Sequence, residues 1–237
     1  MPVQLATAPD PARPGVGVVM VSTWRVGTPA RQRATVDAIS RVWRARAWPD
    51  AGLLSYSVAI GEDGDSLLHY SQWSGEEAYE RFVGASRDER VAEIDAAVPG
   101  IERLGLGRYA LYRSGASPAG DTRAPGCVVV VDVEFRPGEP GAAQIREGWV
   151  DAVFEALDTD PHLPPGGISA HFHLSTDGTR VLNYAEWESA RAHIDALAAV
   201  GEGIGSPTEE WARVRAYPGV RGSTLTRYTP AISLSAG

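Results

Sequence analysis

Two seven-residue runs of the chain each contain a polar side chain followed, four residues later, by a tryptophan. The runs LLHYSQW and VLNYAEW place His69 before Trp73 and Asn183 before Trp187. An amide can donate a hydrogen bond to a developing oxyanion, and an imidazole can act as a donor or as a base near neutral pH. An indole can form a flat apolar wall of a pocket. The two runs therefore predict sites for small aromatic molecules.

Both runs have the composition of a β-strand, in which successive side chains point to opposite faces of the sheet. His69 and Trp73 therefore share one face of the first strand, and Asn183 and Trp187 share one face of the second. The alternative is structural: a core strand whose tryptophan packs and whose Asn or His is hydrogen-bonded inside. An Asn on an apolar strand face costs about 1–3 kcal/mol if it lacks partners, so a functional hypothesis is worth testing.

The two runs lie 114 residues apart (187 − 73), and other features keep the same spacing. The offset also maps Asp63-Gly64 onto Asp177-Gly178 and Gly52 onto Gly166. Matching positions over such a span predict an internal duplication, a tandem repeat. Near the end of the second copy the offset becomes 119, which indicates about five extra residues around 201–207. We expect a loop extension there, with a lid as the alternative.

Each half of the sequence predicts the same order of elements. In the first half, strands are expected at 16–26, 52–60, 67–73 and 104–112. Helices are expected at 29–47 and from about 74, and residues 87–96 either continue the second helix or form a following one. In the second half, strands are expected at 127–135, 168–174, 181–187 and 220–228, and helices at 142–157 and 189–200. Thr28 and Pro29 suit the start of the first helix, and the Asp-Gly pairs favour hairpin turns. The order β-α-β-β-α-β is that of a ferredoxin-like unit.

These elements divide the chain into four parts. We expect a flexible arm at 1–15, a first ferredoxin-like repeat at 16–112, a linker at 113–126 and a second repeat at 127–230. The linker RSGASPAGDTRAPG is rich in small residues, Pro and Gly, which is typical of a connecting segment. Since each sheet would have helices on one face only, its other face must also be buried. The prediction is an α+β fold in which both repeats pack sheet to sheet as an intramolecular dimeric α+β barrel.

Composition and charge exclude several classes of protein. The 237 residues are 43% hydrophobic and 22% charged, with a net charge of −8. An acidic chain without Lys/Arg clusters is a poor nucleic-acid binder. The sequence has no run of about 20 apolar residues, so no membrane span is expected, and residues 1–15 do not form a secretory signal. The single Cys127 cannot form an internal disulfide, which fits the cytoplasmic location that we expect.

The pair His171 and His173 is a further candidate site. On a strand the two imidazoles share one face and are spaced to chelate a metal ion. The matching positions of the first repeat hold Ser and Ala, and a third ligand from His162, His193 or an acid is not motivated by any pattern. We therefore expect no metal and interpret the pair as polar lining of the barrel.

These features together resemble the antibiotic biosynthesis monooxygenase family of the dimeric α+β barrel superfamily. The resemblance rests on the order of elements, the Asp-Gly hairpins and the phrases GLLSYS, HYSQW and NYAEW, and it extends from about residue 16 to residue 228. In family members that form small quinones, an Asn and a Trp on this strand line a pocket between sheet and helices. There, polycyclic anthrones react with molecular oxygen without metal, flavin or haem. Asn183 and Trp187 match that motif, whereas the first repeat has His69 in place of the Asn and keeps Trp73.

The resemblance implies an oxidoreductase: a monooxygenase that acts with O2 on a polycyclic aromatic molecule of anthrone or polyketide type, in natural-product biosynthesis. Its catalytic residues would be Asn183, Trp187, His69 and Trp73. The other aromatic and imidazole side chains considered for substrate contact are Trp24, Tyr70, Tyr184, His171 and His173. The family also uses an Arg on or after the second helix, for which the candidates are Arg87, Arg90, Arg213 and Arg215.

The resemblance implies that no cofactor is required and that O2 is the co-substrate. Two alternatives stay open: an oxygenase of the same fold that takes reduced flavin as a diffusible co-substrate, and a non-catalytic protein that binds small molecules. Haem-degrading relatives have a His about ten residues after the strand Trp, but Val83 and Leu197 occupy those positions, which argues against haem. The expected partner is a small aromatic substrate, not nucleic acid or a membrane. The sequence leaves open whether the chain forms a homodimer.

Overall fold

The computed structural model describes residues 3–6, 8–49, 52–116, 121–138, 141–159, 165–199, 204 and 206–236. The chain divides into two compact α+β units: the first combines an N-terminal segment with the C-terminal residues, and the second is one contiguous segment. The first unit is Met1–Ala110 with Tyr228–Gly237, and the second is Leu111–Arg227. No helix in the described part of the chain is long and apolar enough to cross a membrane.

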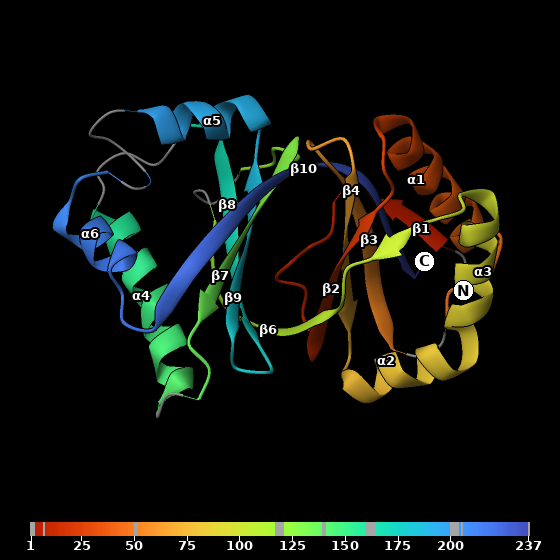
Figure 1. Cartoon of the computed structure of the whole chain (residues 1–237), viewed down its shortest axis with the longest axis horizontal. Coiled ribbons are helices and arrows are strands. Elements are labelled where there is room, and N and C mark those ends of the chain that lie inside the picture. The colour runs from red at the N-terminus through yellow and green to blue at the C-terminus, as the bar shows by residue number, and fades with distance from the viewer. Residues whose placement is uncertain are drawn as a thin grey trace. The chain divides into compact units, whose positions relative to one another are not determined.

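The first unit is an antiparallel sheet with α1 and α3 on one side of it (Figure 1). Its strands β2 (Val18–Arg25), β3 (Leu53–Gly61) and β4 (Ser66–Trp73) are ordered with β4 in the middle. The short strand β5 (Glu102–Arg103) pairs with β2. The helices are α1 (Pro29–Arg44), α2 (Glu76–Phe82) and α3 (Asp88–Ala97), and a π-helical turn at Val83–Arg87 joins α2 to α3.

Helix α1 begins where the sequence predicts. The Thr28 side chain accepts a hydrogen bond from the backbone N–H of Arg31, 3.2 Å away, and Pro29 occupies the first turn. This satisfies a backbone donor that has no partner inside the helix. From there Ile39 and Trp43 recur at helical spacing and are buried against the sheet, which orients the helix over β3 and β4.

The second unit repeats this order of elements. Strand β9 (Arg180–Trp187) lies between β7 (Cys127–Phe135) and β8 (Gly167–Ser175), and all three are antiparallel. Helices α4 (Ala142–Thr159), α5 (Ala190–Ala198) and α6 (Glu209–Arg215) belong to this unit. Figure 1 shows α4 and α6 on the same side of the strands.

Helix α6 follows the predicted loop extension, in a stretch to which the sequence analysis assigns no element. Thr208 caps it by accepting a hydrogen bond from the N–H of Trp211 at 3.3 Å, and Glu209 and Glu210 lie in its first turn, where negative charge suits the helix dipole. Seven residues are too few for a clear helical period, so the cap was the only available signal. Of the predicted insertion at 201–207, residues 201–203 and 205 lie outside the described residues.

Two strands contribute residues to both units. In the first unit, Gly107–Tyr109 of β6 (Gly107–Ala116) pairs with β2, and Tyr228–Ser235 of β10 (Val220–Ala236) pairs with β3. In the strand order β6 also neighbours β8, and β10 also neighbours β7. Residues 113–116 are therefore strand and not linker, and the last strand extends to Ala236 instead of ending at 228.

The N-terminal arm also differs from the prediction. Val3–Ala6 forms strand β1, whose residues pair with Ala236–Ser233 of β10. The edge of β10 offers backbone N–H and C=O groups that need partners, and an added strand supplies them. A short segment with one exposed leucine gives no sign of this pairing in the sequence, because the partner lies at the other end of the chain.

The two units share local details at positions 114 residues apart. Gly52 and Gly166 have positive φ angles of 84° and 83°. A Cβ atom at Gly52 would lie 2.9 Å from Cβ of Ala78, and one at Gly166 would lie 2.6 Å from Cβ of Ala192. Each glycine thus permits a close approach to the following helix, and each is followed by an irregularity in the strand register. The two units therefore share the geometry of this turn.

Candidate functional site

Each unit has a pocket between its own sheet and its own helices. The first pocket has a volume of about 340 Å³ and the second of about 240 Å³. His69 and Trp73 line the first pocket, and Asn183 and Trp187 line the second. The strand alternation therefore places each polar group and its tryptophan on the pocket side of β4 or β9, as the sequence predicts.

His69 lies at the bottom of the first pocket with one ring nitrogen unpartnered. Its Nδ1 lies 2.7 Å from the hydroxyl of Tyr56, while Nε2 is buried and has no hydrogen-bond partner among the described residues. Burial, together with the positive charge of Arg103, lowers the pKa of His69 to about 3. The imidazole is therefore neutral at pH 7. It presents to the pocket either an N–H donor or a lone pair, according to its tautomer.

Aromatic side chains form the walls of this pocket. The ring of Trp24 lies 3.9 Å from that of His69, and the rings of Trp73 and Tyr79 meet edge to face at 5.3 Å. The Trp73 indole N–H donates to Ser71 Oγ at 2.9 Å, which fixes the ring. Trp24 thus lines the first pocket, its contact with a substrate stays a prediction, and the walls suit a flat apolar ligand.

Three arginines also line the first pocket. Arg87 and Arg90 come from the π-helical turn and α3, and were candidates from the sequence; Arg103 comes from β5 and was not. Arg103 stacks over Trp24, with its guanidinium carbon 4.4 Å from the ring centroid. A two-residue strand has no periodic pattern, so nothing in the sequence predicts that Arg103 lies beside Trp24.

The second pocket has a different polar inventory. Oδ1 of Asn183 is buried without a hydrogen-bond partner, and so is the indole N–H of Trp211 on α6. Phe154 and Phe172 supply further aromatic walls, with ring centroids 5.4 Å apart. The pocket therefore offers one unused acceptor and one unused donor in apolar surroundings. The sequence missed Trp211 because it missed α6.

Trp187 is held between the second pocket and helix α5. Its ring meets that of His193 edge to face at 4.8 Å, and His193 Nδ1 accepts a hydrogen bond from Arg227 Nε at 2.9 Å. Burial, and then the charge of Arg227, lower the pKa of His193 to about 4. His193 is thus a neutral packing partner of Trp187.

Arg213 and Arg215 do not line the second pocket. Arg213 pairs with Glu155 of α4, and Arg215 donates to the carbonyl of Ser206 at 3.3 Å. Both arginines lie in the last turn of α6, where positive charge suits the helix dipole. The pocket of the first unit is therefore lined by arginines, whereas the described lining of the second pocket includes none.

Four predicted substrate contacts lie on the opposite face of their sheets. Tyr70 and Tyr184 are buried and follow His69 and Asn183 directly in the chain, so the strand alternation turns them away from the pockets. His171 and His173 alternate in the same way with Phe172, which faces the second pocket. All four are corrected here: none lines either pocket.

His171 and His173 are satisfied by hydrogen bonds in unit 2. His171 Nδ1 lies 2.9 Å from Ser114 Oγ, and its Nε2 lies 3.0 Å from Ser169 Oγ, which in turn donates to Glu186 at 2.6 Å. His173 Nδ1 lies 3.0 Å from the carbonyl of His171. In the part of the chain that the structure describes, no three His, Cys, Asp or Glu side chains are grouped to hold a metal ion. His162 lies outside that part.

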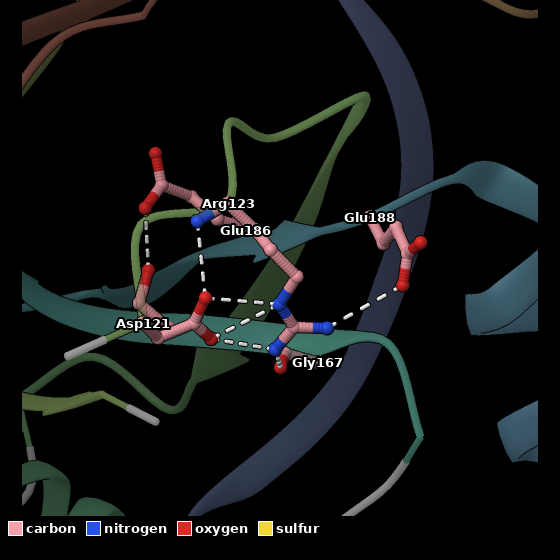
Figure 2. Close-up of polar contacts among 6 residues, drawn as sticks. Asp121, Arg123, Gly167, Glu186 and Glu188 are labelled. Carbon is pink, nitrogen blue, oxygen red and sulfur yellow. Dashed lines mark hydrogen bonds and ion pairs between the residues drawn. The ribbon is translucent and has the colours of Figure 1, made fainter. Parts of the chain in front are cut away.

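Arg123 holds the segment before β7 against the end of β8 (Figure 2). Its guanidinium pairs with Asp121, with the shortest N–O distance 2.6 Å, and donates to the carbonyl of Gly167 at 3.0 Å. A longer ion pair of 3.4 Å joins it to Glu188. Gly167 lines the second pocket, so these contacts fix the backbone at one edge of that pocket and tie down residues 121–126 of the predicted linker.

Comparison with known proteins identifies the fold. No family model and no curated protein matches the sequence. Among solved structures, an anthrone oxidase-like protein is 20% identical with a TM-score of 0.68, covering 93% of both chains. A candidate monooxygenase from Fusobacterium nucleatum subsp. nucleatum is 11% identical with a TM-score of 0.58, covering 95% of this chain and 97% of that one.

A candidate monooxygenase from Lactobacillus acidophilus is 8% identical with a TM-score of 0.55, covering 91% of this chain and 95% of that one. The chain shares the fold of these proteins. At such low identities the likeness carries no residue roles, so the chemistry of this chain must be argued from its own two pockets.

Proposed function

We propose that the protein is an oxidoreductase, a monooxygenase that uses O2 to oxidise a polycyclic aromatic small molecule of anthrone or polyketide type in natural-product biosynthesis. The observation that carries the proposal is the pair of unpartnered polar atoms, His69 Nε2 and Asn183 Oδ1, at matching positions of the two units. Each is buried in an aromatic pocket beside a tryptophan. Solved structures that share the fold and bear the names anthrone oxidase-like protein and candidate monooxygenase add support.

The unpartnered atoms argue against a purely structural role for these strands. A buried polar atom without a hydrogen bond costs about 1–3 kcal/mol, and a core position would be less costly with an apolar residue. A ligand hydroxyl would donate to Asn183 Oδ1, and a ligand hydroxyl or carbonyl would bond to His69 Nε2 according to its tautomer. His69 and Asn183 therefore fit ligand-binding atoms better than core atoms.

The proposed chemistry needs only what the pockets offer. A phenolic anthrone loses a proton from its methylene carbon, and the resulting carbanion reduces O2; overall, CH2 and O2 give C=O and H2O. The NH2 group of Asn183 would donate a hydrogen bond to the enolate oxygen, its Oδ1 would accept from a ligand hydroxyl, and Trp187 would hold the ring plane. In the first unit, neutral His69 would bind the same oxygen or accept the proton, with Trp73 and Trp24 as walls. We propose that no cofactor is required.

The finer description of the fold is also a proposal. The matched glycines Gly52 and Gly166, and the repeated order of elements, support an origin by duplication. We propose that the two repeats form one intramolecular dimeric α+β barrel of the antibiotic biosynthesis monooxygenase type.

Oxygen uptake tests the function. Metal-stripped, flavin-free protein is mixed with dithranol, a tricyclic anthrone, and compared with His69→Ala, Asn183→Ala and the double variant. Removing a group that stabilises an oxyanion is expected to lower kcat about 10²-fold in the unit that works. Arg191→Ala, at an exposed residue of α5, is the control and keeps full activity, and thermal unfolding shows that each variant folds.

The outcomes separate the alternatives. Uptake that is faster than autoxidation and lost in one variant supports the proposal and shows which unit reacts. Uptake that appears only when reduced flavin is added indicates a flavin-dependent oxygenase. If oxygen uptake is no faster than autoxidation in both conditions, the enzymatic proposal is overturned. If the pockets still bind the anthrone in that case, the protein is a non-catalytic binding protein.

A further inference from the structure

The two pockets differ sharply in charge. The first is lined by Arg87, Arg90 and Arg103, and no Asp or Glu is among its described lining residues. The second is lined by one acid, Asp158, and by no Lys, Arg or His among those described. The chain as a whole has a net charge of −8, so a group of three cations in one pocket is a local feature and not a consequence of composition.

Arg90 is a buried cation held by neutral groups. Only 6% of it is exposed, and its terminal nitrogens donate to the carbonyls of Ser86 at 2.9 Å and Ala47 at 3.3 Å. Its guanidinium carbon lies 4.9 Å from the ring centroid of Trp43, and its Nε is buried without a partner. Burial lowers the pKa of Arg90, but a guanidinium stays protonated in proteins.

A buried charge without a counter-ion is unfavourable unless something compensates it. No carboxylate lies within ion-pair distance of Arg90 among the described residues. A negatively charged ligand group in the pocket would supply the missing counter-ion, and would do so in a site of low dielectric, where the attraction is strong.

Arg103 is a second cation in the first pocket, and only some of its donors have partners. One terminal nitrogen pairs with Asp95 at 2.7 Å, but Nε is buried and unpartnered. The guanidinium lies over Trp24, and Trp24 contacts His69. A ligand stacked on the pocket walls would therefore meet the free donors of Arg103, Arg90 and, in one tautomer, His69.

The second pocket has no cationic side chain among its described lining residues that could compensate a ligand already ionised when it binds. Its unpartnered groups are the Asn183 oxygen, which repels negative charge, and the Trp211 N–H, a single neutral donor. Asp158 adds a carboxylate to the lining. A ligand with one neutral donor and one neutral acceptor, such as a hydroxy-ketone, satisfies both unpartnered atoms.

We propose that the two pockets take differently charged ligands: the first binds an aromatic anion, with its charged oxygen atoms at Arg90 and Arg103, and the second binds an uncharged aromatic molecule. This inference rests on the proposed function only in treating both pockets as ligand sites. The protein then has two unequal sites: the first recognises a carboxylate or phenolate substituent that is already ionised when it binds, and the second takes a ligand whose charge develops only on deprotonation in the site.

Equilibrium titration of the full chain tests the charge preference without any turnover. The probes are anthraquinone-2-carboxylate and its neutral isostere anthraquinone-2-carboxamide, followed by calorimetry at low salt. The carboxylate is expected to bind the first pocket about ten-fold tighter than the carboxamide, since charge-assisted hydrogen bonds are about twice as strong as neutral ones. A third probe, 2-hydroxyanthraquinone above the pKa of its phenol, shows whether a phenolate serves as well.

Two variants locate the binding sites. Arg103→Gln is expected to abolish the preference for the carboxylate, and the part of the side chain that is exposed makes loss of folding a small concern. Trp211→Phe is expected to lower the affinity for the carboxamide probe and leave the affinity for the carboxylate probe unchanged. Arg191→Gln, an exposed arginine that lines neither pocket, is the matched charge control.

Salt supplies a test that needs no variant. Raising the salt from about 50 to about 500 mM is expected to weaken the binding of the carboxylate probe but not the binding of the carboxamide probe. Equal affinities for the two probes, a preference that survives Arg103→Gln, or no carboxylate binding at about 1 mM would each overturn the inference. Because these readouts are equilibrium constants, they can fail while oxygen uptake succeeds, and the reverse.

Discussion

The hydroxyl of Tyr56 lies 2.7 Å from Nδ1 of His69, and this pair has no counterpart in the second unit. The matching positions, 114 residues later, are Ala170 and Asn183. Burial raises the pKa of Tyr56 well above its usual range, so the phenol keeps its proton at neutral pH. The first unit thus holds an oriented imidazole where the second holds an amide.

Removing the Tyr56 hydroxyl tests whether orientation of His69 matters. In an Asn183→Ala background, which isolates the first unit, Tyr56→Phe is expected to lower kcat for dithranol about ten-fold, because the imidazole loses its tautomer preference. Stability is expected to fall by only about 1 kcal/mol, the usual net value of one hydrogen bond. A variant with unchanged kcat would show that Tyr56 is only a packing residue.

Trp211→Phe tests whether the indole N–H of Trp211 binds a ligand or whether Trp211 is only a packing residue. The indole N–H is buried without a partner, so its removal relieves a cost of about 1–3 kcal/mol that offsets the packing lost with the smaller ring. The melting temperature is expected to change little, while the affinity of the second pocket for a neutral anthraquinone falls about ten-fold. A large loss of stability with unchanged affinity would contradict a role in binding. Trp149→Phe is a matched control, because its indole N–H is already bonded to the carbonyl of Val214 at 3.3 Å.

Buried histidines make the fold sensitive to mild acid. Burial lowers the pKa of His69 to about 3 and, with the charge of His171 as a second cause, that of His173 to about 4. In the unfolded chain these groups bind protons below about pH 6.5, whereas in the folded chain they do not until the pH is much lower. The free energy of unfolding is therefore expected to fall as the pH decreases from about 6.5 to 4, by about 1.4 kcal/mol per pH unit for each histidine.

Thermal unfolding at a series of pH values measures this slope. His69→Asn is expected to flatten it between pH 6.5 and 4, because it removes one of the groups that titrates only in the unfolded chain. An unchanged slope in His69→Asn would show that His69 is protonated in the folded protein. The same pKa also predicts that oxygenase activity has no inflection near pH 6.5 that depends on His69.

How far the sequence could predict this molecule depends on how local each feature is. Hairpins and strand faces followed from Asp-Gly pairs and alternation, and the cap at Thr28 followed from one residue type. Tyr70 and Tyr184 were placed in the pockets against that same alternation. The shared strands β6 and β10 depend on pairing between distant segments, for which a single sequence has no signal.

The sequence also cannot show which polar atoms in the pockets lack hydrogen-bond partners. That His69 Nε2 and Asn183 Oδ1 lack partners depends on every neighbouring atom, including those of helix α6 and strand β5. The residue types indicate that these side chains are polar, but only their surroundings in the folded chain show that the two atoms lack hydrogen-bond partners. The same holds for Arg103, whose importance comes from its contact with Trp24.

Arg123 is expected to matter for local order and not for catalysis. The Arg123 side chain is 40% exposed in its ion pairs with Asp121 and Glu188, so solvent screens them and Arg123→Ala should cost about 1 kcal/mol of global stability. Hydrogen exchange of residues 121–126 is expected to accelerate, since the guanidinium no longer bridges to Gly167. Arg191→Ala, which breaks an isolated pair with Asp195, should leave that exchange unchanged. Slow exchange in Arg123→Ala would show that the segment is held by other contacts.

Alanine substitutions at Gly52 and Gly166 test whether the following helix lies equally close to the two turns. Alanine at either position must adopt a positive φ and would also press its Cβ against Ala78 or Ala192. Backbone strain of this kind costs about 1–3 kcal/mol, and the steric contact adds to it. Gly15→Ala separates the two effects, because Gly15 has a φ of 80° and nothing within 4 Å of an added Cβ. Gly52→Ala and Gly166→Ala are therefore expected to destabilise the protein by similar amounts, both greater than Gly15→Ala, as measured by thermal unfolding. If the two differed as much from each other as from Gly15→Ala, the helix contacts in the two units would not be equivalent, and the case for a structural duplication at this turn would be lost.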